Sequence, residues 1–161
     1  MATITKNGLT GPRFGGVPYS DSYVRDFTLL TDSAGKIADS DTPGSAIAIA
    51  DVVRLGVLPA GIELHAAIAA ISDAFTAATT FKLGFAYTDG VDDTAVPQDD
   101  DYFILAGAAS SAIAILGSSN VSVSRVTLPK DAYLILTNAG AAHASVGRAD
   151  FIVFGKNKGV K

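Results

Sequence analysis

The stretch Thr79-Thr80-Phe81-Lys82-Leu83-Gly84-Phe85-Ala86-Tyr87 decides the fold class of this 161-residue chain. Bulky apolar side chains stand at every second position, and Lys82, Gly84 and Ala86 lie between them. Alternation of this kind belongs to a β-strand that turns one face toward a core and the other face away from it. The stretch therefore predicts a strand.

Short apolar or alternating runs, bounded by turn residues, recur along the rest of the chain. We expect further strands at 23–30, 46–49, 51–57, 102–105, 112–116, 121–128, 132–138 and 149–154. Many short strands separated by turn signals are typical of a sandwich or barrel. The chain is predicted to be all-β, a jelly-roll-like antiparallel β-sandwich or barrel of about eight or nine short strands with an extended N-terminal arm.

The segment from Ile62 to Phe75 fits two structures. Its many alanines, and the spacing of Ile68, Ile71 and Phe75, are compatible with a helix. However, apolar residues also alternate from Ile62 to Ala70, and no N-cap residue follows Gly61. We favour a strand.

Composition supports a chain that is not mainly helical. Alanine occurs 27 times and glycine 16 times, and all acidic residues except Glu63 are aspartates. Aspartate competes for backbone hydrogen bonds and favours turns, whereas helical proteins coat their exposed faces with glutamate and lysine. The chain has no cysteine, which excludes disulfides, thiol nucleophiles and thiolate metal sites.

The length predicts one domain, flanked by two short segments. Residues 1–20 contain six glycines and prolines and show no sustained period, so we expect an extended arm there. Residues 21–155 form the predicted β-sandwich, and residues 156–161 form a basic tail. No apolar run is long enough for a membrane-spanning helix, and the N-terminal residues do not resemble a secretory signal.

Charge is unevenly distributed, although the net charge is only −4. Residues 1–25 carry +2, residues 148–161 carry +3, and the segment between them carries −9. Basic ends on an acidic body suit docking to a complementary protein surface, and the alternative is that terminal lysines only keep loose ends solvated. The basic residues are too few and too scattered for a nucleic-acid-binding stripe.

No constellation of catalytic residues stands out. The two histidines, His65 and His143, are 78 positions apart and do not form a metal-binding motif. The Gly-x-Ser-x-Gly context of a serine nucleophile is absent, and Gly11-Pro-Arg-Phe-Gly-Gly does not resemble a phosphate-binding loop. The sequence predicts no enzymatic activity, no cofactor and no catalytic metal.

One acidic segment concentrates oxygen ligands, with carboxylates at Asp89, Asp92, Asp93, Asp99, Asp100 and Asp101. Such clusters can bind calcium, but their spacing does not match the EF-hand pattern and no bidentate glutamate is present. We favour a solvated loop, or a loop that faces a basic patch of a partner, over a calcium site.

Three stretches carry a family resemblance: 51–64 (DVVRLGVLPAGIEL), 83–93 with 97–103, and 128–137 (LPKDAYLILT). They resemble small virion structural proteins of tailed bacteriophages, of the capsid decoration or cement type. The resemblance runs from Asp51 to Gly155. It implies a jelly-roll-like protein that binds the outside of an assembled capsid and joins neighbouring shell subunits, and it supplies no catalytic residues.

This resemblance implies two partners, the major capsid protein and further copies of the chain in a homodimer or homotrimer, without nucleic acid or membrane. The protein would be made in the host cytoplasm and would reside on the capsid exterior of the virion. We expect partner contacts from the arm and the tail, at Lys6, Arg13, Phe14, Tyr19, Lys156, Lys158 and Lys161. The alternative is a tail-fibre or spike module that binds a receptor or carbohydrate, against which the absence of tryptophan counts.

Overall fold

The computed structural model describes residues 3–5, 21–40, 44–109, 114–120 and 125–159, and in these residues all regular structure is β-strand. The prediction of an all-β fold is confirmed. Within the described ranges, no helix is long and apolar enough to cross a membrane. The strands are β1 (Thr3–Thr5), β2 (Ser22–Thr31), β3 (Val52–Leu58), β4 (Ile62–Asp73), β5 (Thr80–Tyr87), β6 (Asp99–Ala108), β7 (Ala114–Gly117), β8 (Ala132–Ala139) and β9 (Gly147–Asn157).

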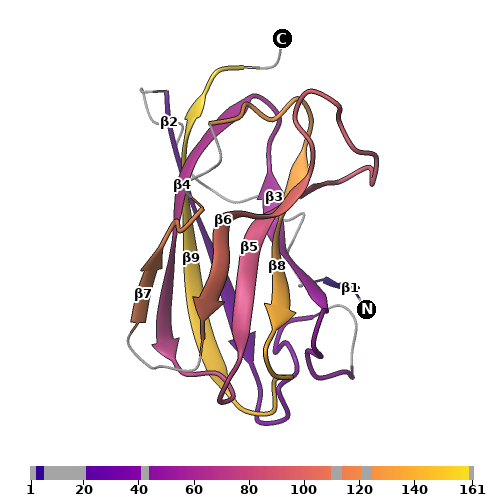
Figure 1. The fold of residues 1–161 in the computed structure, drawn as a ribbon, viewed down its shortest axis with the longest axis vertical. Coiled ribbons are helices and arrows are strands. Elements are labelled where there is room, and N and C mark those ends of the chain that lie inside the picture. Colours follow the sequence, from indigo (N-terminus) through magenta and orange to yellow (C-terminus); the bar gives the residue numbers. More distant parts are fainter. Residues whose placement is uncertain (1–2, 6–20, 41–43, 110–113, 121–124, 160–161) are drawn as a thin grey trace.

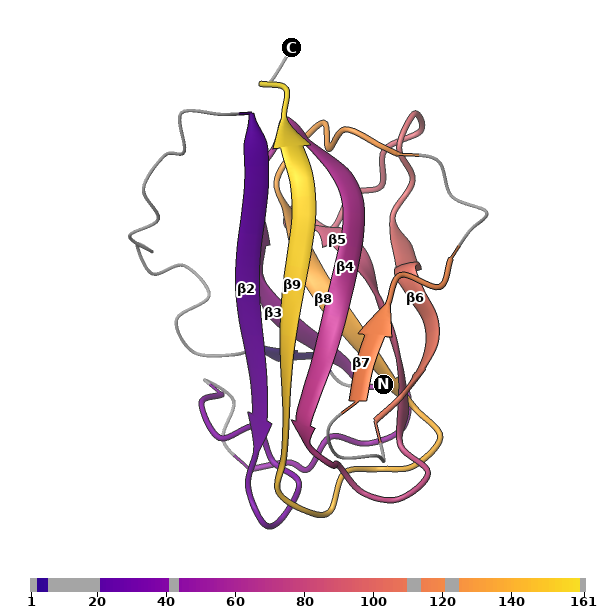
Figure 2. The same cartoon turned by 90° about the vertical axis from the view of Figure 1, so that its left-hand side faces the viewer.

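Two sheets pack face to face, in the orders β1-β3-β8-β5-β6 and β2-β9-β4-β7 (Figures 1 and 2). Strands β2 to β9 pair in nested antiparallel fashion: β2 with β9, β3 with β8, β4 with β7, and β5 with β6. This is a long hairpin rolled up on itself, with the ladders β4–β9 and β5–β8 completing the sheets. The predicted jelly-roll-like sandwich is confirmed.

The core lies between the sheets and is built from the side chains that alternate inward along each strand. Phe81 of β5 and Phe151 of β9 meet edge to face across the sandwich, with ring centroids 5.8 Å apart. Gly56 of β3 makes room for Phe27, because a Cβ atom at Gly56 would lie 2.3 Å from the phenylalanine ring. Aromatic rings of this size, buried on both sides, supply a large part of the apolar burial.

The alanine-rich segment that also fitted a helix is strand β4, as we favoured. It pairs with β9 on one side and with β7 on the other. Its inward residues are buried in the core, and they include Leu64, Ala67, Ala69 and Ile71. Small side chains on both faces are tolerated here because the strand is internal to its sheet.

Some expected boundaries were wrong. The segment from Ala46 to Ile49 is not a strand: it makes an isolated bridge between Ala46 and Lys36, and then a turn. Ala50 adopts a positive φ of 67° in this turn, and the carboxylate of Asp51 accepts a hydrogen bond from the backbone N–H of Ala48. Of the expected strand at 121–128, the described residues 125–128 contain only a bridge.

At the N-terminal end, β1 pairs in parallel with β3, and the side chain of Ile4 is buried in the core. Residues 1–2 and 6–20, which make up most of the predicted arm, lie outside the described residues. At the other end, β9 continues to Asn157 and so includes Lys156.

Candidate interaction surfaces

The outer face of the sheet β2-β9-β4-β7 carries an apolar patch, and Figure 2 views this sheet from outside. Cross-strand neighbours on it include Val24 beside Phe154 and Ile152 beside Ile68. Val24 is 62% exposed and Leu30 is 41% exposed. We call this patch the apolar face; its members are Val24, Ala66, Ile68, Ala70, Ile152 and Phe154. The exposed Asp26 stands at its edge beside Ile152, and Leu30 lies beyond it, beside Arg148.

Polar groups border the apolar face at both ends. At one end, Glu63 binds Lys158 at 2.5 Å and His65 at 2.9 Å. Hydrogen bonds from Lys158 and then from His65 lower the pKa of Glu63 to about 2. Toward the other end, Asp150 accepts hydrogen bonds from Thr28 and Arg148. The apolar face is therefore a bounded patch with a charged rim, which is the usual composition of a protein interface.

The two described lysines among the predicted contact residues both form ion pairs within the chain. Lys156 lies 3.4 Å from Asp21, and Lys158 pairs with Glu63, while both ammonium-bearing side chains stay about half exposed. The other predicted contact residues lie outside the described residues; they are Lys6, Arg13, Phe14, Tyr19 and Lys161.

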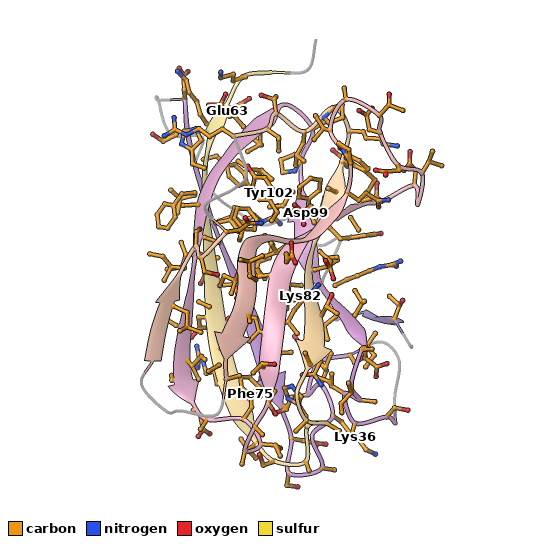
Figure 3. The ribbon with its side chains drawn as sticks, viewed as in Figure 1. Lys36, Glu63, Phe75, Lys82, Asp99 and Tyr102 are labelled. Atoms are coloured by element: carbon orange, nitrogen blue, oxygen red, sulfur yellow. The ribbon has the colours of Figure 1, made fainter. Side chains whose placement is uncertain are left out.

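The outer face of the other sheet is mixed in character. Lys82 of β5 lies 3.3 Å from carboxylate oxygens of both Asp100 and Asp101 (Figure 3). Burial, together with the charges of Asp101 and Asp100, raises the pKa of Asp99. The three carboxylates lie close enough to share a cation, but the ammonium group of Lys82 already lies against two of them and offsets one negative charge.

Next to this cluster, Arg54 of β3 covers the ring of Tyr133 of β8, with 4.6 Å between the guanidinium carbon and the ring centroid. The two residues are 79 positions apart in the chain and were not among the predicted site residues. No short-range pattern in the sequence joins them, because only the β3–β8 ladder brings them together.

The acidic segment uses its carboxylates to shape its own backbone. Asp92 accepts hydrogen bonds from the backbone of Asp93 and Gln98, and Asp93 accepts from Ala95 and Val96. Side chains that hydrogen-bond nearby N–H groups in this way stabilise turns. These bonds favour the interpretation as a loop that is held by its own aspartates.

Lys130 ties this loop to the sandwich. Its ammonium group lies 2.8 Å from Asp89, donates to the carbonyl of Val91 and lies 4.6 Å from the ring centroid of Tyr87. Burial, followed by the charges of nearby aspartates, raises the pKa of Tyr87 to about 12. The Tyr87 hydroxyl donates to the carbonyl of Val96.

The two histidines lie at opposite ends of the sandwich. His65 binds Glu63, whereas His143 packs against Phe75; Figure 3 shows Glu63 and Phe75 far apart along the long axis. His143 is buried, and its Nε2 lies 3.2 Å from the Oδ1 atom of Asn138. The two imidazoles therefore have separate environments and do not share a site.

A shallow depression of about 430 Å³ is lined by Ile4 of β1 and by residues of the connection between β2 and β3; these are Asp32, Lys36, Ile37, Ala38, Ser40, Gly44 and Ser45. The Asp32 carboxylate accepts backbone hydrogen bonds from Ala34 and Lys36, and these bonds lower its pKa. The Asp32 carboxylate in this depression thus stabilises the loop around it.

No protein-family model matches the chain, and no curated protein matches it in sequence. Among solved structures, it is similar to a chain of "Capsid of Ralstonia phage GP4", with a TM-score of 0.66 and 19% sequence identity over 99% of this chain and 100% of that chain. A weaker similarity is to a chain of "Acidic stable capsid structure of Helicobacter pylori bacteriophage KHP30", with a TM-score of 0.48 and 15% identity over 84% and 88% of the two chains. The first comparison shows a shared fold along the whole chain.

Proposed function

We propose that this chain is a structural protein of a bacteriophage virion that binds the outer surface of the capsid and cements neighbouring major capsid subunits. The observation that carries the proposal is the fold that the chain shares, end to end, with a chain of a phage capsid structure. The resemblance of its turn and strand stretches to decoration proteins points to the same role.

The proposed role is adhesive and not catalytic. In the described residues, the clustered ionisable groups of the two sheets are engaged in bonds that hold the fold: Glu63 with Lys158, Lys82 with Asp100, and Asp92 with the loop backbone. Such groups rigidify a scaffold and leave binding to the sheet faces and chain ends.

Self-association is part of this proposal, and the apolar face is the surface that supports it. Val24 exposes apolar area beside Phe154, and Ile152 and Ile68 continue this area on the same sheet. Contiguous apolar surface of this kind marks protein–protein contacts, since its burial releases water. A homodimer or homotrimer would then attach to the shell at several points, which multiplies weak contacts into firm attachment.

The arm and tail residues remain the proposed contacts at the chain ends. Lys156 and Lys158 are about half exposed, so each can add a second carboxylate from a partner while keeping its own. For the arm, deletion of residues 1–20 is the direct test, because unchanged capsid binding would contradict its contribution.

The proposed function is tested with undecorated shells of the major capsid protein of the same phage. Purified protein is mixed with the shells, and co-sedimentation and the heat resistance of the shells are measured. We expect saturable binding and a higher temperature of shell disruption. Absence of binding, together with binding to host cells or glycans, would favour the receptor-binding alternative.

A further inference from the structure

The Arg54–Tyr133 pair lies on the outer face of the sheet β1-β3-β8-β5-β6. Arg54 stands between the buried Val53 and Leu55, and Tyr133 lies between Ala132 and Leu134, which are also buried, so both side chains turn away from the core. The guanidinium carbon of Arg54 is 4.6 Å from the centroid of the Tyr133 ring.

This pair retains unused hydrogen-bonding capacity. In the described part of the chain, the guanidinium of Arg54 makes no hydrogen bond or ion pair, and the Tyr133 hydroxyl has no hydrogen-bond partner. Five other described cations each pair with a carboxylate of the same chain; they are Lys82, Lys130, Arg148, Lys156 and Lys158. Arg25 donates to the carbonyl of Val57. Lys36 and Arg125 form no ion pair in the described residues, but neither lies over an aromatic ring there as Arg54 does. A guanidinium offers five N–H donors in a planar fork.

The stacking on Tyr133 holds this fork in place before any partner arrives. Arg54 is half-buried, and its direct cross-strand neighbour, Ile135, is only 6% exposed although it lies on the outer face. A guanidinium fixed on an aromatic ring loses little conformational freedom when it binds. Its planar fork matches a carboxylate through two parallel hydrogen bonds.

The two outer faces of the sandwich differ in composition, and each suits a different kind of partner. Permanent contacts between identical subunits are the more apolar class of interface, which suits the apolar face. Contacts between separately formed proteins are more polar, and arginine and tyrosine dominate their binding energy. The face that carries Arg54 and Tyr133 has this second character, with Lys82 and Asp100 beside them.

We propose that Arg54, held by Tyr133, anchors the chain to the capsid by binding a carboxylate on the shell protein. This inference rests on the proposed function and names the face and the chemistry of that contact. Charge complementarity supplies the occupant, since the fork is positive, pre-oriented and without a carboxylate of its own in the described residues.

The test compares variants in binding to undecorated shells, with the full chain throughout. Arg54→Ala is expected to weaken binding at least about 10-fold, which is the loss typical of a central arginine. Arg54→Lys keeps the charge without the fork or the stacking and is expected to lose affinity as well. Lys36→Ala, which removes one positive charge from the loop between β2 and β3 and lies on neither proposed contact surface, is the control of equal charge and is expected to bind like wild type.

Circular dichroism, thermal melting and light scattering accompany each measurement. If Arg54→Ala does not fold, Arg54→Lys and Tyr133→Ala decide the matter. If the wild-type protein does not bind shells, both the proposed function and this inference are wrong. Wild-type binding that the Arg54 variants do not weaken overturns this inference alone, and so does a change in oligomeric state without a change in shell affinity.

Discussion

The imidazole of His143 lies edge-on against the ring of Phe75, with centroids 4.9 Å apart and an interplanar angle of 65°. His143 is only 3% exposed, and its Nδ1 atom has no hydrogen-bond partner in the described part of the chain. Burial lowers the pKa of His143 to about 4 from its ordinary value of 6.5. The imidazole that packs against Phe75 is therefore neutral at neutral pH.

We predict that the protein loses stability as the pH falls from 6.5 to 4. In this range the unfolded chain binds a proton at His143 that the folded chain does not, so stability is complete above pH 6.5 and declines toward pH 4. The difference between these two pKa values corresponds to about 3 kcal/mol in the free energy of unfolding. Urea unfolding at several pH values measures the decline.

His143→Gln is the control for this pH dependence. It removes the titrating group and should flatten the curve between pH 6.5 and 4. Glu63 acts in a lower window, because its lowered pKa makes its contribution fall only as the pH drops from 4.5 toward 2. A variant with the same decline as wild type would show that His143 is not its source.

Local alternation in the sequence was sufficient to predict strands such as Thr80–Tyr87, where the inward and outward residues differ sharply. It was insufficient for Ala46–Ile49, because a strand also needs a ladder partner. This segment makes only an isolated bridge at Ala46 and then turns at Ala50. Strand order could not be predicted, since partners such as Thr28 and Asp150 are 122 positions apart.

The candidate surfaces show the same limit. A strand was expected at 23–30, but its alternation did not show that the exposed Val24 lies beside Phe154 of β9. Arg54 and Tyr133 were missed, because their stacking depends on the β3–β8 register and on nothing within either strand. The alternation along a strand indicates which face of the sheet a side chain lies on. Its neighbours on that face depend on how the strands pair.

We predict that Gly84→Ala destabilises the fold. A Cβ atom at Gly84 would lie 2.0 Å from the carbonyl oxygen of Asp99, because the backbone of β6 crosses closely over β5 there. Relief of this clash requires backbone shifts that cost about 1–3 kcal/mol or more. Chemical denaturation measures the change.

Gly117→Ala is the matched control for Gly84. Nothing lies within 4 Å of a Cβ atom at Gly117, so we expect unchanged or slightly increased stability. Equal stabilities of the two alanine variants would contradict the close approach at Gly84.

We predict that calcium leaves the stability of the chain unchanged. The oxygens of Asp92 and Asp93 accept backbone hydrogen bonds, and the ammonium group of Lys82 lies between Asp100 and Asp101. A cation would have to displace these bonds. Melting temperatures in millimolar calcium and in chelator should agree, and a clear rise with calcium would instead establish a metal site in this segment.

We predict that Val24→Asp weakens self-association. Val24 is 62% exposed at the edge of the apolar face, beside Phe154, so the substitution should spare the fold but place a carboxylate in the proposed contact. Burial of an unpaired charge opposes association strongly. Light scattering and sedimentation over a range of protein concentrations measure the effect, which we expect to be a loss of at least about 10-fold in association constant.

Val91→Asp is the matched control, because Val91 is also 62% exposed but lies in the acidic segment, away from the apolar face. The two variants have the same net charge, so a general electrostatic effect would act on both. Loss of association in Val24→Asp alone assigns the contact to the outer face of β2-β9-β4-β7. An aspartate at Val24 would lose its hydration if the apolar face were buried between copies. If Val24→Asp leaves the oligomer intact, or if both variants disrupt it equally, self-association must use another surface.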